Sequence, residues 1–198
     1  SASRGIVAMT KGFNLIYNNG LEAVGTTPLI KLSRIVPEDS ADILVKYEGV
    51  NIGGSIKTRT ALNMINDAES KGIITPDTVI VEPTSGNQGI GLALIGAVKG
   101  LKVKIIMPDS VSEERRKLVK AYGAELVLIH DDGDIGACIE ECLATALRMA
   151  EEDKNVWVPQ QFVNPANPQI HRNSTALEIL EQANCKIDGF CSGVGTGG

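Results

Sequence analysis

The sequence predicts an α/β protein in which helices cover a mostly parallel sheet in three layers. From residue 42 onward, short runs rich in β-branched residues alternate with longer segments of helical periodicity, which is typical of a parallel sheet wrapped by helices. The chain has 198 residues, of which 43% are hydrophobic and 22% are charged, so it can bury a core and lacks the composition of a disordered protein. We therefore expect a globular fold.

Six short apolar runs are the predicted strands. In chain order they are 42–50 (DILVKYEGV), 78–83 (TVIVEP), 102–107 (KVKIIM), 124–129 (AELVLI), 155–160 (NVWVPQ) and 187–192 (IDGFCS).

Four segments between these runs have helical features. Residues 89–100 are apolar nearly all round and predict a buried helix, whereas 110–123 begins with Ser110 three residues ahead of Glu113, as in a capping box, and ends at Gly123. The other two segments carry apolar stripes and should cover the sheet. These stripes are Ala61, Met64, Ile65 and Ala68, and Ile135, Ile139, Cys142, Leu143, Ala146 and Ala150.

The charge distribution argues against a polyanionic partner. The formal net charge is -5 and the basic residues are scattered, so the sequence offers no patch for nucleic acid or for an anionic membrane surface, and small molecules are the expected partners. No apolar run reaches the roughly 18 residues of a membrane-spanning helix, and residues 1–15, which we interpret as a tail outside the fold, lack the apolar core of a signal peptide. We expect a cytoplasmic protein.

The four cysteines are interpreted as free thiols. Cys138 and Cys142 are four residues apart and would share one helix face, but no histidine nearby completes a set of metal ligands, and Cys185 and Cys191 show no metal-site spacing. We expect no bound metal.

Three loops stand where a parallel sheet binds its ligands, outside the carboxyl ends of the strands. The first, 51–59 (NIGGSIKTR), should place Lys57 in the first turn of a helix. The positive end of a helix dipole favours the neutral amine, which both imine formation and proton abstraction require. Taken alone, the loop is better explained by a solvated first-turn lysine beside Arg59.

The other two loops are candidate anion sites. In 83–91 (PTSGNQGIG), backbone N–H groups and the hydroxyls of Thr84 and Ser85 should converge on a helix N-terminus and hold a carboxylate or phosphate, although simple helix capping would explain these hydroxyls as well. In 193–198 (GVGTGG), backbone amides and Thr196 form a phosphate cradle. The same letters resemble the opening of a dinucleotide-binding fingerprint, but the remainder of that motif and its acidic ribose partner would lie beyond the last residue of the sequence.

Six ordered motifs together resemble one enzyme family. The sequence from about residue 16 to its last residue resembles the cysteine synthase family, the fold type II pyridoxal-phosphate enzymes that include O-acetylserine sulfhydrylase and cystathionine β-synthase and are similar to the tryptophan synthase β fold. The motifs are 25–32 (GTTPLIKL), 51–59, 83–93 (PTSGNQGIGLA), 107–128 (MPDSVSEERRKLVKAYGAELVL), 161–171 (QFVNPANPQIH) and 192–198 (SGVGTGG).

The resemblance implies a role for each loop. Lys57 would form the Schiff base with pyridoxal 5'-phosphate, and Asn87 would lie beside the cofactor's ring hydroxyl. The cofactor phosphate would lie among Gly195, Thr196, Gly197 and Gly198. The substrate carboxylate would be surrounded by Thr84, Ser85, Gly86, Gln88 and Gln161.

The resemblance also implies a reaction. Lys57, displaced by the substrate amine, would remove the Cα proton, a leaving group would depart from Cβ, and a nucleophile would add there. Cysteine synthesis from O-acetylserine, or a related activated serine, and sulfide is the expected β-replacement, carried out by a homodimer. A β-eliminating lyase of the cysteine desulfhydrase or serine dehydratase type, and a non-catalytic binding relative, remain alternatives.

The sequence departs from the family pattern in four residues and in length. The family usually has asparagine, proline, aspartate and threonine where this chain has Thr26, Ile52, Thr58 and Gln88, and Gln88 falls inside the carboxylate loop. Family members are longer, so we expect this chain to be part of a longer protein, truncated in its second domain. Residues 49–164 would form the small domain, and 16–48 and 165–198 would be parts of the large domain.

Overall fold

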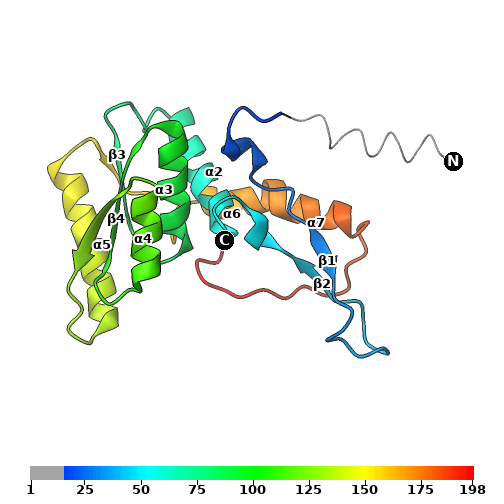
Figure 1. Ribbon diagram of the computed structural model, residues 1–198. Coiled ribbons are helices and arrows are strands. Elements are labelled where there is room, and N and C mark those ends of the chain that lie inside the picture. Colours follow the sequence, from blue (N-terminus) through cyan, green and yellow to red (C-terminus); the bar gives the residue numbers. More distant parts are fainter. Residues whose placement is uncertain (1–15) are drawn as a thin grey trace.

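A four-stranded parallel sheet forms the centre of the larger part of the molecule. The computed structural model describes residues 16–198, so the predicted tail lies outside the described residues. The strand order in the sheet is β5-β4-β3-β6 (Figure 1). The strands are β3 (Val79–Pro83), β4 (Lys102–Pro108), β5 (Glu125–Ile129) and β6 (Val156–Trp157).

Helices cover both faces of this sheet. One face is packed by α3 (Asn87–Lys99) and α4 (Glu113–Ala121), with α2 (Lys57–Ser70) packed against α3, and the other face by α5 (Ile135–Glu152). Alternate strand residues therefore enter different cores, because successive side chains of a strand point to opposite faces. Ile80 and Ile105 pack toward α3, whereas Val81 and Ile106 pack toward α5. The expected three-layer α/β fold is confirmed.

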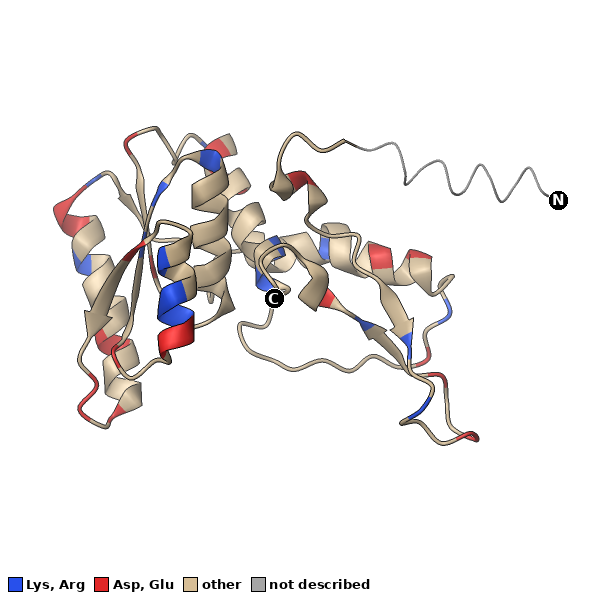
Figure 2. Cartoon of the chain, in the orientation of Figure 1, with Lys and Arg blue, Asp and Glu red and all other residues tan. Residues whose placement is uncertain are grey.

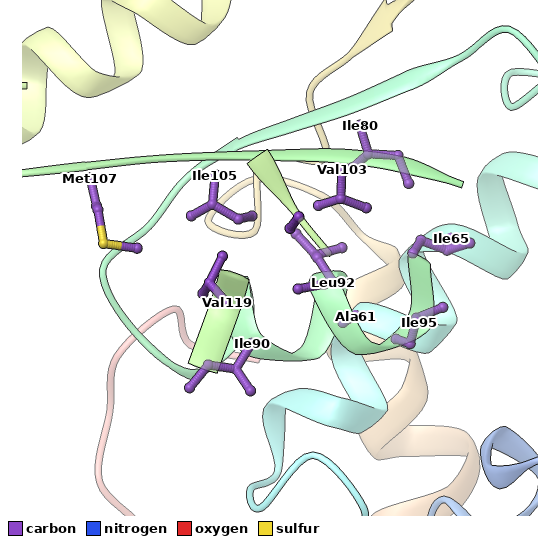
Figure 3. Close-up of a cluster of buried hydrophobic side chains, with 12 residues drawn as sticks. Ala61, Ile65, Ile80, Ile90, Leu92, Ile95, Val103, Ile105, Met107 and Val119 are labelled. Atoms are coloured by element: carbon purple, nitrogen blue, oxygen red, sulfur yellow. The ribbon is translucent and has the colours of Figure 1, made fainter. Parts of the chain in front are cut away.

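The core between the sheet and α3 contains the largest group of buried side chains (Figure 3). Leu92 and Ile95 of α3 are fully buried between strand β4 and helix α2, as the apolar character of 89–100 predicted. The predicted stripe of α2 is also confirmed, since all four of its members are at most 1% exposed.

A smaller part of the molecule lies on the far side of α2 (Figure 1). Its strands β1 (Leu29–Lys31) and β2 (Leu44–Lys46) pair antiparallel, with the short 3-10 turns η1 (Gly20–Ala23) and η2 (Glu48–Val50) nearby in sequence. Helix α6 (Ala166–Ile170), a π-helical turn η3 (His171–Thr175) and helix α7 (Ala176–Gln182) run on without a break. The last residues return to the side of α6, where the chain meets Asn167.

One strand prediction was wrong in part, and another was wrong in full. Residues 42–50 contribute only β2, which belongs to the antiparallel pair, and 187–192 form no strand. A strand needs a hydrogen-bonding neighbour, and no described residue pairs with 187–192, where Phe190 is 77% exposed.

Two helix predictions also need correction. Helix α4 begins at Glu113 with Ser112, not Ser110, as its N-cap residue and has no side-chain cap; the hydroxyl of Ser110 donates a hydrogen bond to Asp131. On α5 the buried residues are Cys138, Cys142 and Ala146, whereas Ile135, Ile139 and Leu143 of the predicted stripe are substantially exposed.

Charges of both signs are interspersed over the helices and loops (Figure 2). Within residues 16–198 no helix has the length and apolar character needed to cross a bilayer. Cys138 and Cys142 are buried free thiols, and Cys185 and Cys191 are exposed. Burial and the neighbouring Cys138 raise the pKa of Cys142 to about 12, so this thiol stays protonated at neutral pH.

Candidate functional site

Lys57 is the first residue of α2, as the glycine-rich loop before it predicted. Its backbone N–H donates to the Ser55 hydroxyl at 3.2 Å, and its side chain is half-buried. Desolvation by burial lowers the pKa of the Lys57 amine. The structure thus enlarges the population of neutral amine, the form that reacts with a carbonyl carbon or accepts a proton.

Arg59, two residues further, belongs to a buried ion network that we define as Arg59, Glu48, Glu178 and Lys46. The guanidinium is 2% exposed and binds both carboxylates through paired contacts, at 2.7 and 2.8 Å to Glu48 and at 2.6 and 2.7 Å to Glu178. Lys46 binds Glu178 at 2.7 Å from the other side. The network fixes the first turn of α2 against α7. Arg59 is therefore a buried residue and not a solvated neighbour of Lys57.

The second loop leads from β3 into α3 and leaves the start of that helix without a side-chain cap. Gly86 is the N-cap residue, and the Thr84 hydroxyl accepts the N–H of Gly86 at 3.2 Å rather than capping the helix. Neither Thr84 nor Ser85 caps α3. The N–H of Gly89 donates to the Gly86 carbonyl at 3.1 Å, and those of Asn87 and Gln88 remain available to an anion, which the helix dipole also favours.

Helices α2 and α3 approach closely beside Lys57. A side chain on Gly91 would lie 3.1 Å from the Lys57 carbonyl oxygen and 3.0 Å from Ala61, so the glycine permits this contact. The Gln88 side chain is buried in the same interface, where its Oε1 accepts the Thr60 hydroxyl at 2.8 Å. The Thr60 hydroxyl also lies 3.0 Å from the Lys57 carbonyl oxygen. Gln88 therefore ties the start of α3 to the Lys57 turn.

Gln161 is held near the end of β3 by Glu82. Glu82 Oε1 accepts the backbone N–H of Gln161 at 3.0 Å, and Oε2 accepts that of Gln160 at 2.9 Å. Burial raises the pKa of Glu82 to about 7, although these two hydrogen bonds lower it.

The third loop meets the same region through Asn167. The Asn167 amide donates to the Gln161 carbonyl at 2.8 Å and to the Thr196 hydroxyl at 2.9 Å. Thr196 is half-buried, and Gly195, Gly197 and Gly198 beside it are exposed. A side chain at Gly198 would collide with the Asn167 side chain, so a larger residue there would displace Asn167.

Continuous contacts thus connect the segments that the sequence singled out. The Lys57 turn reaches the Thr84–Gln88 loop through Gln88, and it reaches α6 through Asn63, whose amide donates to the Ala166 carbonyl at 2.7 Å. Asn87 is exposed at the start of α3. Sequence reasoning placed the three loops but missed Glu82 and Asn167. An acid inside the buried run TVIVEP is a signal that pointed to Glu82.

His171 lies close enough to Lys57 for the lysine charge to act on it, and its ring bonds within its own helical turn. Its Nδ1 lies 3.0 Å from the Thr175 hydroxyl, the structural hydrogen bond of a π-helical turn. Burial, followed by the positive charges of Lys57 and Arg59, lowers the pKa of His171. Across residues 16–198, no three His, Cys, Asp or Glu side chains come together in a way that would hold a metal ion.

The parallel sheet and the glycine-rich loop that follows β3 place the chain among the α/β folds, which bind small molecules at the carboxyl ends of their strands. The chain belongs to the pyridoxal-phosphate-dependent enzyme family, whose model matches residues 21–198. A cysteine synthase of a Flavobacterium species is 50% identical over 182 residues, which are 92% of this chain and 58% of that protein. A cysteine synthase of Staphylococcus aureus is 47% identical, over 91% of this chain and 57% of that protein.

Solved structures agree with this assignment. A hydrogen sulfide-producing enzyme from Fusobacterium nucleatum superposes with a TM-score of 0.80 at 45% identity, over 87% of this chain and 56% of that one. A variant of O-ureido-L-serine synthase with O-ureido-L-serine bound has a TM-score of 0.84 at 42% identity, over 92% of this chain and 55% of that one. The chain spans somewhat more than half the length of these relatives.

The residues present fit the cofactor of the family. Lys57 offers an amine whose pKa burial lowers, the start of α3 has no side-chain cap, and the glycine-rich loop carries a half-buried hydroxyl on Thr196. Groups of these kinds can form an imine and can bind two separate anions, which a phosphorylated aldehyde and an amino acid together require.

Proposed function

We propose that the protein to which this chain belongs carries out a β-replacement on a small amino acid, with cysteine synthesis from O-acetylserine, or a related activated serine, and sulfide as the reaction. The observation that carries the proposal is the set of contacts that join the desolvated Lys57 to the uncapped start of α3 and to the 195–198 loop. The names of the Flavobacterium and Staphylococcus relatives support the choice of nucleophile.

Each loop has one task in this proposal. Lys57 binds the cofactor aldehyde, and the 195–198 loop, with the Thr196 hydroxyl, holds its phosphate. The start of α3 binds the substrate carboxylate, with Thr84, Ser85 and Gly86 contributing from the loop and Asn87 lying beside the cofactor ring. Gln88 contributes its backbone N–H, since its side chain is buried against Thr60. The side chain of Gln161, anchored through its backbone by Glu82, completes the carboxylate site.

Lys57 moves the proton in the reaction. When bound, pyridoxal phosphate supplies an electron sink for negative charge at the substrate Cα. With its amine free, the Lys57 Nζ would accept the Cα proton, and the lowered pKa of this amine favours the neutral form that can do so. The helix start fixes the carboxylate and thereby the direction of the Cα–H bond.

Three further features complete the proposal. Residues 49–164 form the small domain, and 16–48 and 165–198 contribute to the large one, which agrees with the sheet of β3 to β6 lying apart from β1, β2 and α7 in Figure 1. The protein acts in the cytoplasm, and its functional unit is a homodimer. The domain division and the homodimer rest on the family to which the chain belongs.

A chemical test separates this proposal from its alternatives. Borohydride reduction of the purified protein with pyridoxal phosphate should attach the cofactor to the peptide that contains Lys57, and O-acetylserine with sulfide should then give cysteine. Lys57→Ala should abolish both results. Lys71→Ala is the matched control, because Lys71 is an exposed lysine at the other end of α2. Release of pyruvate without cysteine would identify a β-eliminating lyase, and cofactor binding without turnover would identify a binding protein.

A further inference from the structure

Asn167 is a buried side chain that touches two parts of the proposed site at once. It is 1% exposed, and its Nδ2 lies 2.8 Å from the Gln161 carbonyl oxygen and 2.9 Å from the Thr196 Oγ1. The partners are 6 residues before it and 29 residues after it. Asn167 thus stands between the Gln161 segment and the 195–198 loop.

The chemistry of its neighbours fixes the orientation of the amide. The Gln161 carbonyl oxygen only accepts hydrogen bonds, so the amide nitrogen of Asn167 must face it rather than the amide oxygen. One amide hydrogen then goes to Gln161, and the other goes to Thr196. Both donors of the Asn167 amide are therefore used.

This orientation determines what the Thr196 hydroxyl does. A hydroxyl has one hydrogen to donate and two lone pairs that accept. Because Asn167 donates to Thr196, the Thr196 oxygen acts as an acceptor toward the protein, and its hydrogen is left for a different partner. Phosphate oxygens only accept, so a hydroxyl arranged in this way suits a phosphate.

The other end of the Asn167 side chain also faces the loop. Its Oδ1 is buried and has no hydrogen-bond partner among the described residues, and a side chain built at Gly198 would collide with it. The same asparagine therefore sets the direction of the Thr196 hydroxyl and leaves room only for glycine at position 198.

We propose that Asn167 is a positioning residue that turns the Thr196 hydroxyl toward the phosphate of the bound cofactor. This inference rests on the proposed function, in which the 195–198 loop holds that phosphate. A purely structural link between α6 and the loop is the competing explanation. The two explanations differ because a structural link would affect every ligand of the site, whereas a positioning role affects only ligands that carry the phosphate.

The test compares pyridoxal phosphate with pyridoxal, which has the same aldehyde and ring but no phosphate. Dissociation constants of both are measured for wild-type protein and for Asn167→Leu, which keeps the branched shape, carries no charge and donates no hydrogen bond. Affinity for pyridoxal phosphate should fall about tenfold or more, the factor for a lost hydrogen bond to a charged group. Affinity for pyridoxal should change less than about twofold.

Thr196→Val provides the second arm of the test. If Asn167 acts through the hydroxyl, adding Asn167→Leu to Thr196→Val should weaken pyridoxal phosphate binding by no more than about twofold further. Equal losses for both ligands, unchanged affinity for pyridoxal phosphate, or full additivity with Thr196→Val would each overturn the proposal. Wild-type protein that binds neither aldehyde would instead refute the proposed function.

A second substitution covers the case in which Asn167→Leu does not fold. Asn167→Ser retains a shorter hydrogen-bond donor. Its dissociation constants for pyridoxal phosphate and pyridoxal are compared in the same way, and its folding is checked by circular dichroism. If both variants fail to fold while Thr196→Val folds normally, Asn167 is a stability residue and the positioning role is rejected.

Discussion

The carboxylate of Glu82 accepts the backbone N–H of Gln161 at 3.0 Å, and it does so from the buried end of strand β3. Glu82 is 1% exposed, and burial raises its pKa to about 7 despite the hydrogen bonds that lower it. A single carboxylate thus anchors one of the proposed substrate-binding residues and changes its charge near neutral pH.

The first prediction concerns stability and pH. The pKa of Glu82 is raised from 4.5 to about 7 in the folded state, so between these values the unfolded chain has lost a proton that the folded chain keeps. Protonated Glu82 makes its full contribution to the free energy of unfolding below pH 4.5. This contribution, about 3 kcal/mol, is lost as the pH rises to about 7. Urea unfolding over this range measures it.

Glu82→Gln is the control for that measurement, because glutamine does not titrate. The variant should lose the decline between pH 4.5 and about 7. It should be less stable at low pH, since its amide nitrogen cannot accept one of the two backbone N–H groups. An identical pH slope in wild-type and variant would show that another group is responsible.

The second prediction concerns the ion network around Arg59. Burial raises the pKa of the Glu178 carboxyl. Hydrogen bonds from Arg59 and Lys46 outweigh this effect and lower the pKa to about 2. Glu178→Ala should reduce the free energy of unfolding by about 3 kcal/mol, because it removes one of the two carboxylates that pair with the buried Arg59 and the carboxylate that pairs with Lys46. Glu113→Ala, which removes an exposed ion pair with Lys117, should cost no more than about 0.5 kcal/mol. Similar losses in the two variants would contradict the assignment.

The low pKa of Glu178 also predicts a response to acid. The folded state holds the carboxylate ionised down to about pH 2, whereas the unfolded chain takes up its proton near 4.5. This contribution is therefore present above pH 4.5 and is lost as the pH falls toward 2. Acid titration of Glu178→Gln should show a shallower loss of stability than the wild-type protein, and an equally steep loss would refute the prediction.

A third prediction uses Thr58, where the family has aspartate. The Thr58 hydroxyl oxygen is fully buried and has no hydrogen-bond partner in the described structure. Thr58→Val keeps the shape and removes the unpaired polar group, so it should raise the free energy of unfolding by about 1 kcal/mol. Thr58→Ala, which leaves a cavity, should lower it. A valine variant less stable than wild-type would show that the hydroxyl has a partner.

A fourth prediction concerns Gln88. Replacement by threonine, the usual residue of the family, would remove the contact with Thr60 and leave a void between α2 and α3. Gln88→Thr should lower the free energy of unfolding by about 1–3 kcal/mol. The exposed Gln169 of α6 provides the comparison, because its replacement by threonine changes helix propensity alone and should cost about 0.5 kcal/mol. Equal effects at the two positions would argue against a packed Gln88.

The parts of the fold that follow from local periodicity were predictable from the sequence. The stripe of α2 and the apolar α3 are set within one element, and both are buried as expected. The run 187–192 has strand composition, but composition does not supply a neighbouring strand, and it pairs with none of the described residues. On α5 the apolar pattern predicted a helix without showing that Ile139 would face outward and Cys138 inward.

The parts of the candidate site that depend on local sequence were predictable as well. Lys57 at a helix start follows from the glycines before it, and the other two loops follow from their own composition. Glu82 and Asn167 act through partners 79 and 29 residues away, a relationship that no local pattern contains. The burial of the Gln88 side chain against Thr60 likewise depends on how two helices meet.

The ion network of Arg59 has a consequence for the order in which the chain folds during translation. Glu178 lies 119 residues after Arg59, and it emerges from the ribosome after every strand of the parallel sheet, whose last strand ends at Trp157. Until then Arg59 has only Glu48 as a carboxylate partner. A contact between residues this far apart must overcome a loop-closure cost before it contributes to stability. The first turn of the helix that begins at Lys57 therefore gains its second carboxylate partner only when α7 has been made, after the strands of the sheet.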